Sequence, residues 1–142
     1  MRFMMLMIPN GYEKEVPGAM PDARIVGAMM KYNEELRKAG VLLAIDGLQP
    51  PSMGKRVAFA GGKPTVTDGP FAETKEAVGG YWMIQAKSID EAAAWASRCP
   101  APGDAVIEIR QVHEFADFPA DVQQAAANFP DVQAQHQKQH GA

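Results

Sequence analysis

RVAFAGGKPTVT, residues 56–67, separates the two topologies that the rest of this chain allows. Two strand-like runs flank Gly61-Gly62, and a glycine pair accepts the positive φ angles of a tight hairpin turn. Pro64, at the start of the second run, lacks an amide donor, which restricts that arm to a sheet edge. The segment is therefore predicted to be a β-hairpin. A doubly wound parallel sheet needs a helix here instead, so that topology is disfavoured.

A strand, a helix and a second strand precede the hairpin. Residues 2–8 are apolar on both alternating faces, which is typical of a central strand covered on both sides. A helix is predicted from Pro21-Asp22 to Gly40. Its apolar stripe has one polar member and consists of Ile25, Val26, Met29, Tyr32, Asn33 and Leu36. Residues 41–45 form a short apolar run, which predicts a strand that ends at Asp46-Gly47.

A strand and a capped helix follow the hairpin. Residues 80–86 are aromatic and β-branched, with Tyr81, Met83 and Gln85 on one face and Trp82, Ile84 and Ala86 on the other. Ser88 and Glu91 have the spacing of a capping box, so a helix is predicted from here to Arg98. Its inner face is mostly alanine and consists of Ile89, Ala92, Ala93 and Ala96.

The last predicted strand spans residues 105–115. Ile107, Ile109 and Phe115 share one face, whereas Glu108 and Arg110 share the other. The order of elements is strand, helix, strand, hairpin, strand, helix, strand. This order predicts an α+β fold of the ferredoxin-like split β-α-β kind with an added β-hairpin.

The composition changes near residue 119. Residues 1–118 are expected to form one domain, and residues 119–142 a polar tail rich in alanine and glutamine. Short helices are possible at residues 121–128 and 131–139, separated by Pro130. The tail is either loosely ordered or laid on a partner subunit.

Charge and cysteine content exclude several classes of protein. The 142 residues carry a net charge of −3, so the positive field of a nucleic-acid-binding protein is missing and no direct nucleic-acid partner is expected. The one cysteine, Cys99, cannot form an internal disulfide, which is consistent with a cytoplasmic protein. No apolar run approaches the length of a membrane span, so no membrane partner is expected.

The histidines predict neither a metal site nor a cofactor site. His113 alternates with Ile107 and Ile109, and a structural histidine at a strand end is favoured over a proton-transfer role. His136 and His140 are four residues apart, but in a glutamine-rich tail solvated side chains are favoured over metal ligands. The sequence also lacks a cysteine pair, a phosphate loop and a serine-hydrolase elbow. No metal and no cofactor are therefore expected.

Two groups of charged residues are candidates for binding. Asp68, Glu73, Lys75 and Glu76 surround a proline-glycine turn, where local capping and solvation are the simpler interpretation. Glu108 and Arg110 lie on the second face of an isoleucine-bearing strand. If that face is covered, these two side chains line a polar cavity, and Arg110 presents a cationic group to an anionic ligand.

VTDGPFAETKE, residues 66–76, followed by Gly79-Gly80-Tyr81-Trp82, resembles the hallmark of the YCII-related, DGPF-domain family. Residues 4–8, 40–50, 89–92 and 108–110 are also similar to that family, and the resemblance covers about residues 1–118. It implies a ferredoxin-like subunit that dimerises through its sheet into a dimeric α+β barrel, with the face of Glu108 and Arg110 lining the interior.

The resemblance implies a pocket but no reaction. The enzyme-like branch of the family carries a histidine on the first helix and an aspartate near the end of that helix, where this sequence has Met29 and Lys38. No catalytic residue is therefore assigned. The expected ligand-binding residues are Asp46, Asp68, Glu73, Lys75, Tyr81, Glu108, Arg110 and His113.

Two functions remain open at this point. One is a homodimer that binds a small, anionic molecule in a pocket at the dimer interface. The other is a non-enzymatic protein that binds a regulatory partner, because members of the DGPF branch are commonly encoded near sigma factors. That association carries no mechanism by itself.

Overall fold

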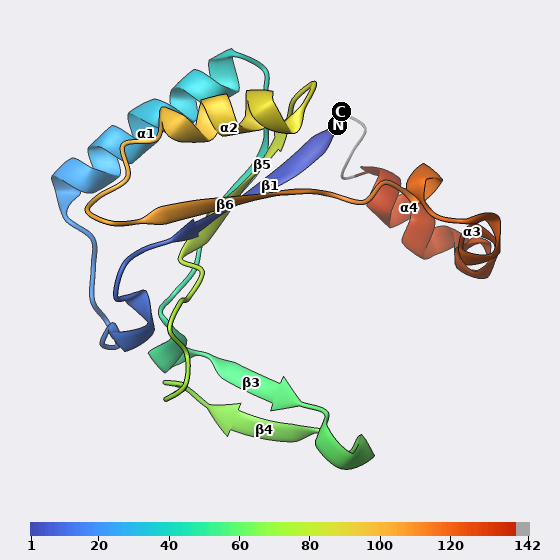
Figure 1. Ribbon diagram of the computed structural model, residues 1–142, viewed down its shortest axis with the longest axis horizontal. Coiled ribbons are helices and arrows are strands. Elements are labelled where there is room, and N and C mark those ends of the chain that lie inside the picture. The colour runs from blue at the N-terminus through green and yellow to red at the C-terminus, as the bar shows by residue number, and fades with distance from the viewer. Residues whose placement is uncertain (139–142) are drawn as a thin grey trace. The chain divides into compact units, whose positions relative to one another are not determined.

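The computed structural model describes residues 1–138, and the chain divides into two compact units. The first unit spans Met1–Gln111 and contains the main sheet, two helices and a hairpin (Figure 1). The second begins at Val112 and contains two short helices. The chain therefore has an α+β architecture, as the sequence predicted. Among residues 1–138, no helix combines the length and the apolarity needed to cross a lipid bilayer.

The main sheet has four strands in the order β2-β5-β1-β6. These strands are β1 (Arg2–Ile8), β2 (Leu42–Gly47), β5 (Gly80–Gln85) and β6 (Val106–Gln111). Each neighbouring pair is antiparallel. The prediction that β1 is central is confirmed, because β1 lies between β5 and β6.

Two helices, α1 (Ala23–Lys38) and α2 (Ile89–Ser97), lie together on one side of the sheet (Figure 1). The carboxylate of Asp22 caps α1 by accepting a hydrogen bond from the amide of Arg24 at 2.7 Å. Ser88 caps α2 as predicted, because its hydroxyl accepts from the amide of Glu91 at 3.1 Å. The Glu91 carboxylate accepts from the Lys87 amide, one residue before the cap itself.

The core lies between the helices and one face of the sheet. Alternate residues of β1 and β5 are buried there with residues from both helices: Phe3, Met5, Met7, Trp82, Ile84, Ala86, Tyr32, Leu36 and Ala92. The rings of Tyr32 and Trp82 meet edge to face at 5.9 Å. The Tyr32 hydroxyl donates to the carbonyl of Trp95 at 2.7 Å, which ties α1 to α2. Each large side chain buried in this layer stabilises the fold by about 1.5–3 kcal/mol.

The first turn of each helix lies outside this core. Ile25 and Val26, predicted to face inward, are 40% and 42% exposed, and Ile89 at the start of α2 is 52% exposed. The prediction of a buried inner face is wrong at these three positions. Helical spacing assigns a residue to a face, but it does not show how far the partner strands extend beneath that face.

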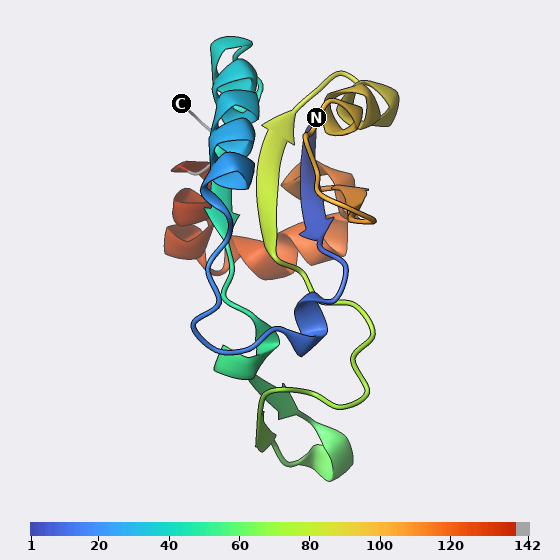
Figure 2. The same cartoon turned by 90° about the vertical axis from the view of Figure 1, so that its left-hand side faces the viewer.

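The predicted hairpin is confirmed. It forms a separate two-stranded antiparallel sheet of β3 (Lys55–Ala58) and β4 (Thr65–Asp68). Gly61 and Gly62 have φ angles of +68° and +80° in the connection, which is the conformation that glycine permits. Figure 2 shows the hairpin beyond the end of the strands of the main sheet.

The predicted last strand is too long at its C-terminal end. Strand β6 ends at Gln111, so His113 and Phe115 do not continue the strand face of Ile107 and Ile109. Gln111 pairs with Phe3 in an antiparallel ladder, so only Arg2 of β1 extends past this pair, and His113 and Phe115 lie beyond the reach of the strand. The alternating pattern of the sequence continues to Phe115, but β1, the neighbouring strand, does not extend that far.

The second unit contains the two short helices that the sequence allowed. They are α3 (Ala120–Ala127) and α4 (Pro130–Lys138), which Asn128 and Phe129 separate. A single 3-10 turn, Phe115–Asp117, precedes them. The predicted domain boundary after residue 118 stays a prediction.

The segment after β4 is held against the loop before β3. The Gly69 amide donates to the carbonyl of Gly54 at 2.9 Å. The guanidinium of Arg56 lies 4.1 Å from the ring centroid of Phe71 and donates to the hydroxyl of Thr74 at 2.7 Å. A Cβ atom on Gly69 would lie 1.7 Å from the carbonyl oxygen of Pro51. Only glycine allows this approach of the two backbones.

We expect Gly69→Ala to lower the free energy of unfolding by about 1–3 kcal/mol, because the new methyl group collides with the Pro51 carbonyl. Gly27→Ala is the matched control, since Gly27 lies within α1 with open space around its Cβ position. That change is expected to stabilise the protein by about 0.5–1 kcal/mol through helix propensity. Chemical denaturation of both variants measures the difference. Equal stability of the two variants would contradict this account.

Candidate functional site

Asp46 and Tyr81 form a direct polar contact on the main sheet. Strand β2 places Asp46 opposite Tyr81 of β5, and the Tyr81 hydroxyl donates to Oδ2 of Asp46 at 2.8 Å. Tyr81 alternates with the buried Trp82, so it belongs to the sheet face opposite the helices. The structure therefore brings together two of the residues that the sequence selected.

The carboxylate of Asp46 controls the ionisation of Tyr81. The pKa of Tyr81 is raised, first because its hydroxyl hydrogen bonds to Asp46 and second because the negative charge of Asp46 disfavours a phenolate. Tyr81 therefore remains a neutral hydroxyl at physiological pH. It can donate or accept a hydrogen bond there, but it is not a base.

The rest of this open face combines apolar and charged side chains. Leu6 lies between Tyr81 and Glu108 in one cross-strand row, and Met4 lies between Met83 and Arg110 in the next. Leu6, Met4 and Met83 are half-buried although none of the helices of the first unit covers this side. Glu108 and Arg110 are exposed, and both lie on this face as the sequence predicted.

Arg110 has no carboxylate within ion-pair distance in the described part of the chain. Glu108, two residues away on the same strand, is therefore not its partner, and the ion pair that the sequence allowed is not formed. With about 4.8 Å between neighbouring strands, the row from Asp46 to Glu108 spans about 14 Å of sheet. This spacing leaves room for a small molecule between the charged groups.

Asp68, Glu73 and Lys75 lie away from this face, on and after the hairpin. Asp68 ends β4, and its carboxylate accepts a hydrogen bond from Nζ of Lys55 on β3. Glu73 and Lys75 are exposed in the segment between β4 and β5. In this structure the signature segment, residues 66–76, holds the hairpin. None of these three residues contacts Asp46 or Tyr81 through an interaction seen in residues 1–138.

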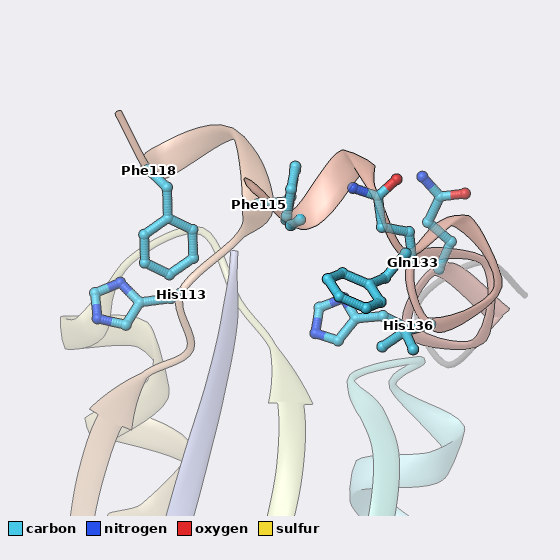
Figure 3. Close-up of a pocket in the computed structure, with 9 residues that line it drawn as sticks. His113, Phe115, Phe118, Gln133 and His136 are labelled. Atoms are coloured by element: carbon cyan, nitrogen blue, oxygen red, sulfur yellow. The ribbon is translucent and has the colours of Figure 1, made fainter. Parts of the chain in front are cut away.

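His113 belongs to the second unit and lines a different cavity. Its ring lies 5.2 Å from the ring of Phe118, and both face a space of about 420 Å³ (Figure 3). Phe115, Phe129 and His136 also line this cavity. His113 is therefore a residue of an aromatic cluster and not of a strand end. His140 lies outside the described residues.

A larger groove of about 620 Å³ lies in the first unit, bounded by α1, β2 and β5. Its apolar lining includes Met7, Met29, Met30, Leu42, Ile45 and Trp82. Asn33 is the buried polar residue of this lining, and its Oδ1 accepts from Nε1 of Trp82 at 2.8 Å. Glu34 and Arg37 of α1 also line the groove and form an ion pair with each other at 2.6 Å.

Neither Asn33 nor the groove is among the binding residues that the sequence predicts. The available signal was a single polar residue in the apolar stripe of α1, because a polar side chain on a buried helix face must find a hydrogen-bond partner. That partner, Trp82, is 49 residues away along the chain. Only the packing of α1 on β5 brings the two together.

Cys99 is not an activated nucleophile. Burial raises the pKa of its thiol to about 11, and its sulfur lies 3.7 Å from that of Met29. No group of three or more histidine, cysteine, aspartate or glutamate residues is arranged to hold a metal ion within residues 1–138.

Comparisons with known proteins agree with the resemblance found in the sequence. The model of the YCII-related domain matches residues 1–116. An uncharacterised protein of Rhizobium meliloti (strain 1021) is 33% identical over 75 residues, which is 53% of this chain. The match spans 60% of that relative's length.

We expect Asp46→Asn to lower the pKa of Tyr81, because the change removes the negative charge that disfavours the phenolate. Phenolate absorbance measured against pH reports the titration. Tyr81→Phe identifies which of the three tyrosine transitions belongs to Tyr81. The account fails if Asp46→Asn leaves that transition unchanged or moves it to higher pH.

Proposed function

The chain belongs to the YCII-related domain family, and on that premise we propose that it binds a small anionic molecule in a pocket between two copies of its sheet. The observation that carries the proposal is the open face of the sheet. Helices α1 and α2 cover one face, and the other face presents apolar side chains beside Arg110, which has no carboxylate partner among residues 1–138.

The order of strands supports the ferredoxin-like arrangement that this pocket requires. Strands β1 and β2 are parallel to each other with β5 between them, and β5 and β6 are parallel with β1 between them. Helix α1 connects the first of these pairs and helix α2 the second. Two such interleaved units make a split β-α-β sheet with both helices on one side. The β3-β4 hairpin is the addition between them.

The apolar residues of the open face favour a homodimer. Met4, Leu6 and Met83 form the centre of that face, and a second copy of the sheet placed against it removes them from water. Two sheets packed in this way make the dimeric α+β barrel. The tail, residues 119–142, is either loosely ordered or laid on a partner subunit, and this stays a prediction.

Arg110 is the proposed anion-binding residue. Its guanidinium presents several N–H donors in a plane, which suits a carboxylate or a phosphate group. Enclosure between two sheets strengthens this interaction because the effective dielectric constant falls. Tyr81 and Glu108 offer hydroxyl and carboxylate groups to the remainder of the ligand. Asp68, Glu73, Lys75 and His113 stay predictions outside this arrangement.

No reaction is assigned. Met29 occupies the position of the histidine of the enzyme-like branch, and Lys38 occupies the position of its aspartate. The sulfur of Met29 contacts Cys99. A thioether and an ammonium group cannot act as the acid and base pair of that branch. A regulatory protein partner is the alternative to pursue if no ligand is found. The cytoplasmic location inferred from Cys99 also stays a prediction.

We expect the purified protein to be a dimer at micromolar concentration, and Leu6→Glu to convert it to a monomer, because a carboxylate is then placed at the centre of the buried interface. Light scattering measures the mass. Lys31→Glu, an exposed change on α1, is the control and is expected to remain dimeric. A monomeric wild-type protein under these conditions would contradict the proposed dimeric barrel.

Thermal-shift measurements with benzoate, citrate, oxaloacetate and inorganic phosphate test the ligand. Any anion that binds the folded state is expected to raise the melting temperature of the wild type by about 3 °C or more near saturation. Arg110→Ala is expected to abolish that shift. Lys31→Ala removes one positive charge from a different place, and its shift is expected to equal that of the wild type. An equal shift in all three proteins contradicts the assignment of Arg110.

A further inference from the structure

Asn33 is the buried polar residue of the groove bounded by α1, β2 and β5. It is 9% exposed and sits in the middle of α1. The groove lies on the helix-covered side of the sheet, since Trp82, Ile45 and Met7 line it. Asp46 and Tyr81, which belong to the open face, also line the groove at the edge of the sheet, whereas Arg110 does not.

The orientation of the Asn33 amide follows from its neighbour. An indole N–H is only a donor, so the atom of Asn33 that faces Nε1 of Trp82 at 2.8 Å must be the carbonyl oxygen. The amide nitrogen, Nδ2, then points away from Trp82. Nδ2 has two N–H groups to satisfy in this position.

The protein satisfies these two donors poorly. The acceptor that Nδ2 reaches is the sulfur of Met30 at 3.7 Å, and a thioether is a weak acceptor. Within residues 1–138, Nδ2 has no oxygen acceptor. A buried N–H without a good acceptor costs stability, so this one is suited to an oxygen atom that enters the groove.

We propose that the groove binds a small neutral molecule with an apolar body, whose carbonyl oxygen accepts a hydrogen bond from Nδ2 of Asn33. The volume of about 620 Å³ is within the range of small-molecule sites. Methionines 7, 29 and 30 line it with flexible apolar side chains that adapt to the shape of a ligand.

The charges around the groove favour a neutral ligand over an anion. Glu34 and Arg37 neutralise each other through two hydrogen bonds, at 2.6 and 2.7 Å. The remaining charged group of the lining is the carboxylate of Asp46, which repels an anion. The site therefore differs in ligand chemistry from the anion site proposed on the open face, and each can fail without the other.

Tryptophan fluorescence tests the proposal directly. The chain has two tryptophans, so Trp95→Phe leaves Trp82, which lines the groove, as the single reporter. Hexanamide is the probe, and 1-chlorohexane is the control, because it is neutral and has the same chain length but no carbonyl oxygen. We expect a saturable change in Trp82 fluorescence with hexanamide and none with 1-chlorohexane at equal concentration.

Asn33→Asp in the same background is the decisive variant. A carboxylate oxygen keeps the acceptor for Trp82 but removes both N–H donors of Nδ2, so the dissociation constant for hexanamide is expected to rise at least about tenfold. Asn128→Asp makes the same chemical change at an exposed position of the second unit and is expected to leave binding unchanged.

The side-chain amide resonances of Asn33 keep the test independent of variant stability. In wild-type protein labelled with ¹⁵N, hexanamide is expected to shift the Asn33 NH₂ signals along the same binding curve. The proposal is overturned if those signals do not move up to the solubility limit of hexanamide, which would leave an ordered water as the occupant. Equal affinity of the Asn33→Asp protein would overturn it as well.

Discussion

Strand β1 is apolar on both of its faces, and the rest of the structure is arranged around that constraint. Phe3, Met5 and Met7 are buried beneath α1 and α2, and they form the core with Trp82 and Ile84 of β5. Met4 and Leu6, on the opposite face, are half-buried although neither helix of the first unit lies above them. Because a strand exposes alternate residues to alternate sides, covering one face of β1 cannot cover the other. The proposed dimer is the consequence of that geometry.

The signature segment has a structural role, although its charged residues suggest a binding site. Residues 66–76 contain the charged residues most visible in the sequence, yet their contacts hold the hairpin. Asp68 binds Lys55, Arg56 lies on Phe71 and donates to Thr74, and Gly69 lets two backbones approach. A family motif of this kind preserves a close packing of loops. Its presence identifies the family without identifying the ligand.

Two polar groups lack a strong partner within the described residues, and they lie on opposite sides of the main sheet. Arg110 is exposed without a carboxylate partner in the described residues, and Nδ2 of Asn33 is buried with a sulfur as its acceptor. The first group suits an anion and the second a neutral carbonyl, because the groove around Asn33 already holds the negative charge of Asp46. Asp46 thus contributes to both environments, through its bond to Tyr81 and through its place in the groove lining.

The sequence by itself determined the helices and strands in their order, the central place of β1, the hairpin at Gly61-Gly62, the start of α1 near Asp22 and the cap at Ser88. These features depend on neighbours a few residues apart, or on an alternation that any strand shares. Only the tertiary structure decided where β6 ends, because that depends on how far β1 extends beside it. Likewise, the contact of Asn33 with Trp82 joins residues far apart in the chain, and periodicity carries no information about which helix packs on which strand. The candidate sites are therefore only partly visible in the sequence. It places Tyr81, Glu108 and Arg110 on strands and Asp46 directly after one, whereas the structure extends β2 through Asp46 and long-range packing creates the groove.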